Sequence, residues 1–172
     1  NMLVRIGHGY DVLKLVTEKE YLEVYPDRKD QKFKLGGMEI AHDKLLLGHS
    51  DADVLIHALC DALLGAAAQR DIGFHFPDTD ESFSGIDSLV LLEKVVAIIE
   101  KEKYSISNID ITVMAQKPKL NTYIPEMITK LAEVLQIERS QLNIKATTTE
   151  KLGFVGREEG IACEAVCVLS GH

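Results

Sequence analysis

The segment 50–69, SDADVLIHALCDALLGAAAQ, constrains the fold most, because its pattern is the clearest helical one in the chain. Its apolar residues recur at helical spacing, as Leu55, Ala58, Leu59, Ala62 and Leu63. An apolar face of this kind must be buried against another layer of secondary structure. We expect Ser50 to open the helix in a capping box with Asp53.

Alternating apolar and polar residues predict the layer that covers this helix. Residues 109–115 show the alternation of a half-buried strand. Further extended segments are expected at 3–7, 33–36, 142–148 and 160–169. Two more helices are expected, one capped by Asp87 or Ser88 and one from about Tyr123. This order favours a single α+β domain over residues 1–172, with a mixed β-sheet of about four strands packed with three helices.

Two segments lack periodicity. Residues 17–32 are charged and predict an exposed surface insertion, and residues 70–86 contain Gly, Pro and acids typical of a loop.

Composition excludes several classes of protein. A chain with 46% apolar and 27% charged residues is not a disordered one. Its net charge of −8 argues against a nucleic-acid partner. Because no apolar run reaches the roughly 18 residues of a membrane span, no membrane partner is expected. Three cysteines without framework spacing indicate structural thiols in a reducing compartment.

The helix 50–69 also carries the strongest chemical signal. Asp53, His57 and Asp61 are spaced i, i+4, i+8 and so share one stripe. Such a stripe can ligate a divalent metal, and His49 and Ser50 lie where a helix N-terminus favours phosphate. The alternative is a capped, partly buried helix whose polar side chains are merely hydrogen-bonded.

Three weaker signals follow. Asp11 comes after a strand and a Gly turn, as a metal carboxylate or a turn-former would. The acids of the 70–80 loop could accept hydrogen bonds from substrate hydroxyls, or they could be solvated. The segment 147–150 could hold phosphate oxygens and Mg²⁺, or could be ordinary strand. Cys60 has no basic neighbour one turn away, which argues against a nucleophile.

Taken together, five runs resemble the 2-C-methyl-D-erythritol 2,4-cyclodiphosphate synthase family of the non-mevalonate isoprenoid pathway. They are RIGHGYDV (5–12), HSDADVLIHALCDALLGAAA (49–68), DIGFHFPDTD (71–80), AQKPK (115–119) and KATTTEKLGFVGREEGIACEAV (145–166). The resemblance covers essentially the whole chain except 17–32. It implies a CMP-forming phosphorus–oxygen lyase: the 2-phosphate of 4-diphosphocytidyl-2-C-methyl-D-erythritol 2-phosphate attacks the β-phosphate, closing a cyclodiphosphate ring and releasing CMP.

The resemblance further implies a homotrimer with active sites at subunit interfaces. Each site would hold a zinc ion and a magnesium or manganese ion at the diphosphate, and the trimer axis could hold an isoprenoid diphosphate. The implied compartment is the bacterial cytoplasm, or a plastid or apicoplast stroma after removal of a transit peptide.

Carried over position by position, the resemblance makes Asp11 and His57 zinc ligands and Glu150 the acid at the second metal. His49 and Thr148 match the residues that stabilise the transition state. The substrate positions are Ser50, Asp61, Asp71, Ile72, Gly73, Phe76, Pro77, Asp78, Thr79, Asp80, Thr147 and Thr149. The cytidine pocket, supplied by a neighbouring subunit, comprises Ala115, Gln116, Lys117, Pro118, Lys119, Leu120 and Asn121. Phe154 and Arg157 match residues near the trimer axis.

One departure affects the zinc site. The family has Asp-x-His at the strand end, whereas this chain has Asp11-Val12-Leu13. Leucine has no lone pair, so two protein ligands remain. His8 should face away from Asp11 in an extended segment and is a poor replacement for the missing imidazole, so zinc is expected to be weakly held.

Two other functions therefore stay open beside the synthase. One is a catalytically impaired trimeric protein that binds a nucleotide or an isoprenoid diphosphate. The other is a metal-dependent phosphohydrolase that uses the same acids.

Overall fold

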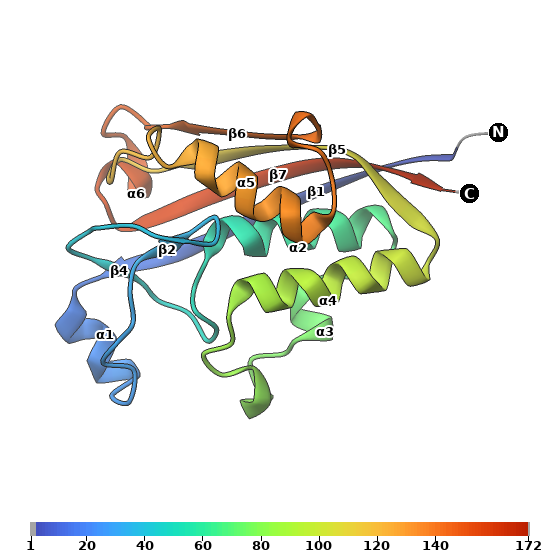
Figure 1. The fold of residues 1–172 in the computed structure, drawn as a ribbon. Helices are drawn as coiled ribbons and strands as arrows, with labels where there is room; N and C mark the ends of the chain where they lie inside the picture. Colours follow the sequence, from blue (N-terminus) through green and yellow to red (C-terminus); the bar gives the residue numbers. More distant parts are fainter. Residues whose placement is uncertain (1–2, 172) are drawn as a thin grey trace.

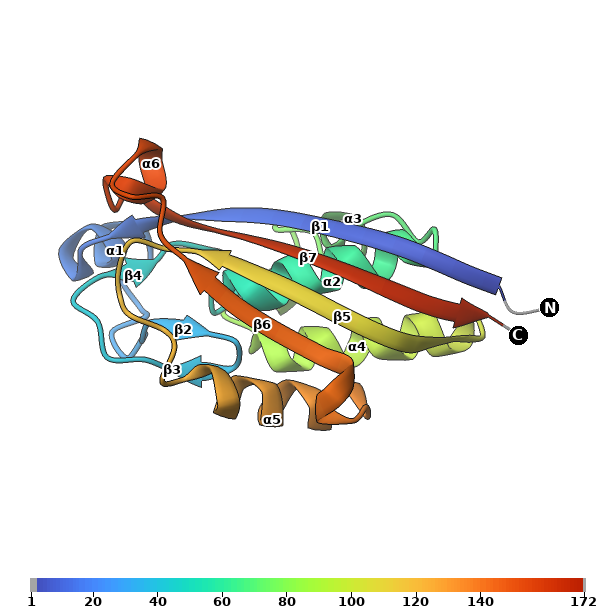
Figure 2. The same cartoon turned by 90° about the horizontal axis from the view of Figure 1, so that it is seen from above.

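A five-stranded mixed sheet in the order β4-β1-β7-β5-β6 carries the fold, and the computed structural model describes residues 3–171 (Figures 1 and 2). The strands are β1 (Leu3–Val16), β4 (Leu45–Leu46), β5 (Tyr104–Met114), β6 (Leu142–Thr147) and β7 (Gly160–Gly171). β7 pairs antiparallel with both β1 and β5, while β5 and β6 are parallel. A separate hairpin pairs β2 (Lys34–Leu35) with β3 (Met38–Glu39).

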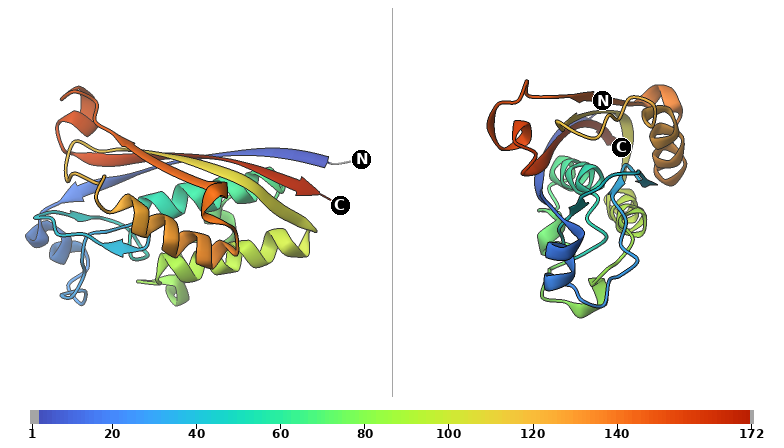
Figure 3. Two further views of the ribbon diagram at one scale, coloured as in Figure 1. Left: turned by 45° about the horizontal axis from the view of Figure 1, so that its top comes forward. Right: turned by 90° about the vertical axis from the view of Figure 1, so that its left-hand side faces the viewer.

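Three long helices support this sheet. They are α2 (Val54–Ala66), α4 (Ser88–Lys101) and α5 (Ile124–Leu135). α2 and α4 lie against one face of the sheet, and α5 lies beside β6 (Figures 1 and 3). The short helices are α1 (Glu18–Val24), α3 (Ile72–His75), η1 (Glu81–Phe83), η2 (Arg139–Gln141) and α6 (Gly153–Gly156). Within residues 3–171, no helix is long and apolar enough to cross a membrane.

α2 is the centre of the core, and two glycines of β1 let the strand approach it. A Cβ on Gly7 would lie 1.9 Å from the carbonyl oxygen of Ala62, and one on Gly9 would lie 1.9 Å from that of Ala58. Any side chain at these positions would push the strand off the helix. The close packing of β1 on α2 therefore depends on the absence of side chains at these two positions.

The opposite face of the sheet carries none of the described helices (Figure 3). It exposes an apolar patch contributed by β1 and β7, comprising Val4, Ile6, Tyr10, Val12 and Val166. The exposed His8 and Glu164 lie on the same face. Apolar side chains exposed together in this way are typical of an interaction surface.

The predicted α+β class and the three long helices are confirmed. The estimate of about four strands matches the four long strands, and the two-residue β4 adds a fifth at the sheet edge. The strand expected at 3–7 runs on to Val16, since β1 pairs with β7 as far as Lys14 and Gly160. The polar residues 8–11 thus belong to the strand. The three cysteines are buried, as expected of structural thiols, and burial raises the pKa of the Cys60 thiol.

The prediction that Ser50 opens the helix in a capping box is wrong. The helix begins at Val54 and its N-cap is Asp53, whose side chain accepts a hydrogen bond from the Ile56 amide at 3.2 Å. The same carboxylate accepts bonds from the amides of Gly36 and Gly37 at 3.0 and 2.7 Å. Asp53 is therefore a buried structural anchor, and its carboxylate is not available to the metal-binding stripe predicted from the sequence.

The prediction that residues 17–32 are irregular and exposed is wrong in part. It contains α1, which starts in a capping box between Thr17 and Glu20, and Tyr21 is fully buried. The Thr-x-x-Glu spacing was a readable signal for this helix. The 70–86 segment likewise contains α3 and η1 between its loops.

We predict that Gly9→Ala destabilises the protein by about 2–3 kcal/mol, because the new methyl group meets backbone that cannot move freely. Gly65 in α2 is the matched control, since a Cβ there meets nothing within 4 Å. Gly65→Ala should instead stabilise by roughly 0.5–1 kcal/mol through helix propensity. Urea unfolding of both variants measures the difference. A neutral Gly9→Ala would contradict the tight strand–helix packing.

Candidate active site

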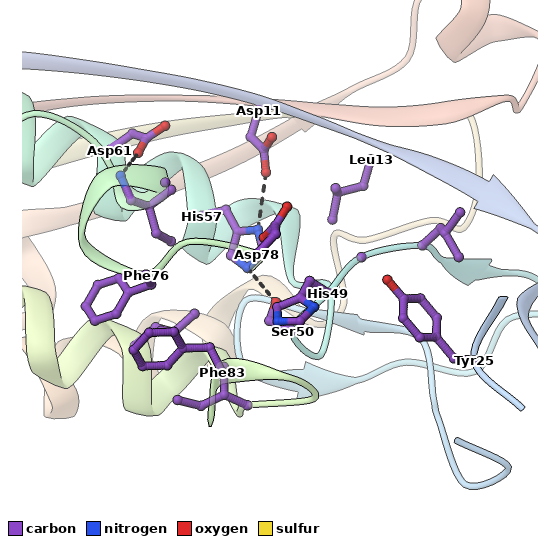
Figure 4. Close-up of a pocket in the computed structure, with 16 residues that line it drawn as sticks. Asp11, Leu13, Tyr25, His49, Ser50, His57, Asp61, Phe76, Asp78 and Phe83 are labelled. Atoms are coloured by element: carbon purple, nitrogen blue, oxygen red, sulfur yellow. Dashed lines mark hydrogen bonds and ion pairs between the residues drawn. The ribbon is translucent and has the colours of Figure 1, made fainter. Parts of the chain in front are cut away.

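A cavity of about 530 Å³ opens between β1, the start of α2 and the 72–91 segment (Figure 4). It brings together nine of the residues predicted from the sequence: Asp11, His49, Ser50, His57, Asp61, Ile72, Gly73, Phe76 and Asp78. Leu13 lines it as well, on the same side of β1 as Asp11. Residues far apart in the chain thus converge on one hollow.

The His57 ring is held at both of its nitrogens (Figure 4). Nδ1 lies 3.3 Å from Asp11 Oδ2, and Nε2 lies 2.9 Å from the Ser50 hydroxyl. The Ser88 hydroxyl lies 3.3 Å from the same Nε2 and donates to Asp51. Strand β1, helix α2 and the turn before it therefore meet at a single imidazole.

Two opposing effects set the protonation of His57. Burial by itself lowers the pKa of the imidazole, but contact with Asp11 and the charges of Asp53 and Asp51 outweigh it, so that the pKa of His57 is raised. Burial also raises the pKa of Asp61, although the Ile72 amide donates to its carboxylate at 2.8 Å. That hydrogen bond ties α2 to α3 beside the cavity.

The other acids of the 70–80 loop have local structural roles. Asp71 caps α3 by accepting from the Phe74 amide at 2.9 Å, and Asp80 caps η1 through Ser82. The carbonyl oxygen of Asp80 lies 3.3 Å from His49 Nε2. Asp71, Pro77, Thr79 and Asp80 belong to the loop but do not line the cavity.

A second cavity of about 340 Å³ collects most of the predicted cytidine and diphosphate residues. Its predicted members are Ala115, Gln116, Pro118, Lys119, Leu120, Asn121, Thr147 and Thr148. Within one chain, His49 and Thr148 thus line different cavities. Lys117, Thr149 and Glu150 line neither of them, and the exposed Glu150 has a left-handed backbone with φ +53°. Phe154 lies in α6 and Arg157 pairs with Glu159 at 3.0 Å, both away from these cavities.

The sequence did not point to several residues of the first cavity. Its unpredicted lining comprises Tyr25, Leu47, Phe83, Ile86 and Leu91. The pattern offers no signal for them, because apolar residues in loops, or in a helix as Leu91 is in α4, resemble ordinary core residues. Ser88 was noted only as a possible helix cap, and its contact with His57 depends on the packing of α4 against α2.

Comparison with known proteins identifies the family. The model described as YgbB family matches residues 4–170. The chain belongs to the YgbB family. Two curated bacterial relatives are named 2-C-methyl-D-erythritol 2,4-cyclodiphosphate synthase. That of Agathobacter rectalis is 56% identical over 98% of this chain and 88% of its own length. That of Francisella tularensis subsp. novicida is 52% identical over 98% of this chain and 99% of its own length.

Solved structures of the YgbB type agree. The structure of the bifunctional IspDF from Campylobacter jejuni has a TM-score of 0.89 and 37% identity over the whole chain, which spans 43% of that protein. IspF of Plasmodium falciparum, in a complex with CDP, has a TM-score of 0.79 and 35% identity over 96% of this chain and 95% of its own. The resemblance expected from the sequence and the enzyme class that it implies are confirmed.

The residues of this YgbB protein do not fit a zinc site with three protein ligands. Asp11 and His57 lie together, but the third position is Leu13, and protein zinc sites ordinarily have three or four protein ligands. His8 lies on the other face of β1, 4.0 Å from Glu164, as expected. Over residues 3–171, no cluster of three or more His, Cys, Asp or Glu side chains is arranged to hold a metal ion.

We predict that Asp11→Asn lowers the pKa of His57 in the chelator-treated protein. Burial lowers the imidazole pKa, and without the Asp11 carboxylate less negative charge remains nearby to oppose this effect. A histidine whose pKa is raised in the folded protein stabilises the fold when it is protonated. This stabilisation is complete at pH values below the ordinary imidazole pKa of about 6.5, and it is lost as the pH rises through the raised pKa. The variant should therefore lose more stability at pH 5.5 than at pH 8.5. NMR titration of His57 and urea unfolding at both pH values test this. An unchanged His57 pKa would contradict the pairing.

Proposed function

We propose that this chain cyclises 4-diphosphocytidyl-2-C-methyl-D-erythritol 2-phosphate to 2-C-methyl-D-erythritol 2,4-cyclodiphosphate, with release of CMP. The observation that carries the proposal is the convergence of Asp11, His49, Ser50 and His57 on one cavity. It is supported by the 56% identity to a curated synthase over 98% of the chain. The bacterial origin of this relative favours the bacterial cytoplasm as the compartment.

The site suits this chemistry. The attacking phosphate and the leaving CMP are anionic parts of one molecule, so positioning and charge neutralisation contribute more than a strong base. His49 and Ser50 would bind and orient phosphate at the turn before α2, through the imidazole and the hydroxyl that line the cavity. The acids and hydroxyls around His57 would hold its proton and fix its ring.

Divalent cations would supply the remaining neutralisation. A bound Mg²⁺ or Mn²⁺ would offset the charge of the diphosphate. Glu150 and the hydroxyls of Thr148 and Thr149 provide the hard oxygen ligands that such an ion prefers. Zinc would have Asp11 and His57 alone as protein ligands.

A homotrimer would complete the site. The first cavity and the 115–121 cavity are separate within one chain, so a neighbouring copy would have to bring the cytidine pocket and Thr148 to His49. The apolar patch of β1 and β7 offers the surface for that contact. Phe154 and Arg157 would then lie near the axis, where an isoprenoid diphosphate could bind. Sedimentation should give about three times the 19.1 kDa of one chain, and an active monomer would contradict this assembly.

Leu13 favours one competing function, a trimeric protein that binds a nucleotide or an isoprenoid diphosphate without turnover. A metal-dependent phosphohydrolase is the other alternative. Incubation of the purified protein with the substrate and Mg²⁺ separates the three functions. Cyclodiphosphate and CMP support the synthase, water-opened products indicate the hydrolase, and binding without turnover indicates the impaired protein.

In that assay, Glu150→Gln should lower turnover by about tenfold or more, because it removes a charge that holds the hard cation. Its exposed carboxylate makes few contacts, so trimer stability should change much less. Excess Mg²⁺ should restore the rate only in part. Full activity of the variant at low Mg²⁺ would exclude Glu150 as the metal acid.

Leu13→His should raise the affinity for zinc, since it places an imidazole beside Asp11 and His57 on the same side of β1. We expect the dissociation constant for zinc to fall by about tenfold or more, because the new imidazole brings the site to the three protein ligands that zinc sites ordinarily have. Equilibrium zinc titration of both proteins measures the difference. Tight and equal binding by the Leu13 protein would show that another residue supplies the third ligand.

A further inference from the structure

The 17–32 segment contains none of the motifs that carry the family resemblance, yet it contacts the turn that carries His49 and Ser50. The Arg28 guanidinium donates to three successive carbonyl oxygens: Nη1 to Gly48 at 3.0 Å and Ser50 at 3.2 Å, and Nη2 to His49 at 2.5 Å. Gln31 Nε2 donates to the next carbonyl, that of Asp51, at 2.9 Å. Two side chains thus bind four consecutive carbonyls.

This turn needs such support. Residues 48–52 form neither helix nor strand, so their carbonyls lack the regular partners of secondary structure. Ala52, at the end of the turn, has φ +63°, a left-handed conformation that persists only where surrounding contacts hold it. Arg28 Nη2 also donates to Ser84 Oγ at 3.0 Å, which joins the turn to the segment that follows η1. The Gly85 amide reinforces that junction by donating to the His49 carbonyl at 2.8 Å.

The guanidinium is itself fixed from the other side. It stacks over the Tyr25 ring, 3.9 Å from the centroid, and donates to the hydroxyl of the buried Tyr21 at 3.3 Å. Tyr25 in turn lines the cavity. The protons of both terminal nitrogens already have protein acceptors, so Arg28 has little capacity left to bind a substrate phosphate.

We propose that Arg28, assisted by Gln31, is a positioning residue that holds the 48–51 turn so that His49 and Ser50 face the cavity. This inference rests on the proposed function for its kinetic consequence. A displaced turn still admits the substrate but loses its alignment in the transition state, and small misplacements of reacting groups are costly.

The test compares Arg28→Ala, Arg28→Lys and Gln31→Leu with the wild-type protein. Arg28→Ala should lower kcat about tenfold or more while KM changes far less, the signature of an interaction lost mainly in the transition state. Arg28→Lys should recover part of the rate, because one ammonium cannot reach all the acceptors. Gln31→Leu removes one contact and should have a smaller effect. Arg139→Ala is the matched control, since Arg139 also donates to a backbone carbonyl, that of Pro125, at 3.1 Å.

An NMR signal of the His49 ring provides a readout that does not depend on turnover. It should shift in Arg28→Ala and stay unchanged in Arg139→Ala. If the wild-type protein makes no cyclodiphosphate, the proposed function fails, while this signal still tests the positioning role. If Arg28→Ala does not fold, Arg28→Lys and Gln31→Leu provide the same comparison.

Three results would overturn the inference. They are an unchanged kcat and His49 signal in the Arg28 variants, a rise in KM alone, which would make Arg28 a substrate ligand, and an equal loss of activity in Arg139→Ala.

Discussion

The close contact between β1 and α2 is the constraint on which the site depends. Gly7 and Gly9 let the strand backbone approach the carbonyls of Ala62 and Ala58 without an intervening side chain. Asp11, two residues beyond Gly9, and His57, one residue before Ala58, therefore reach each other at 3.3 Å. A larger separation of the two elements would break this pair, and with it the arrangement that fixes the imidazole between Asp11 and Ser50. The packing of the core thus sets the geometry of the chemistry.

The acidic composition is consistent with a site for a polyanion because most of the acids near the cavity are occupied internally. Asp53 binds the backbone of the β2–β3 hairpin, Asp61 binds the amide of Ile72, and Asp51 binds Ser88. The amides and hydroxyls that donate to these carboxylates offset their negative charge at short range. The Asp11 carboxylate is paired with the imidazole of His57. The anionic substrate of the proposed reaction would therefore meet few free carboxylates.

Leu13 and the 17–32 segment act on different parts of this cavity. On the floor formed by β1, Leu13 places an apolar side chain, which cannot ligate a metal ion, in the cavity that Asp11 and His57 line. The 17–32 segment adds contacts at the other end, where Arg28 and Gln31 bind the backbone of the 48–51 turn. Leu13 thus limits what the cavity can ligate on one side, while Arg28 and Gln31 hold the turn that carries His49 and Ser50 on the other.

The sequence by itself determined the fold class, the three long helices and the family, because apolar periodicity and long motifs are local properties of the chain. It also placed Asp11, His49, Ser50 and His57 among the site residues, through the motifs that carry the resemblance. Only the tertiary structure decided that Asp53 is a buried cap, that Ser88 contacts His57 and that Tyr25 and Arg28 border the site. The contacts of Asp53 with Gly37, of Arg28 with Gly48 and of Ser88 with His57 join residues that are 16, 20 and 31 positions apart in the chain. The pattern of one segment carries no information about which backbone groups of another will lie beside it once the core has packed.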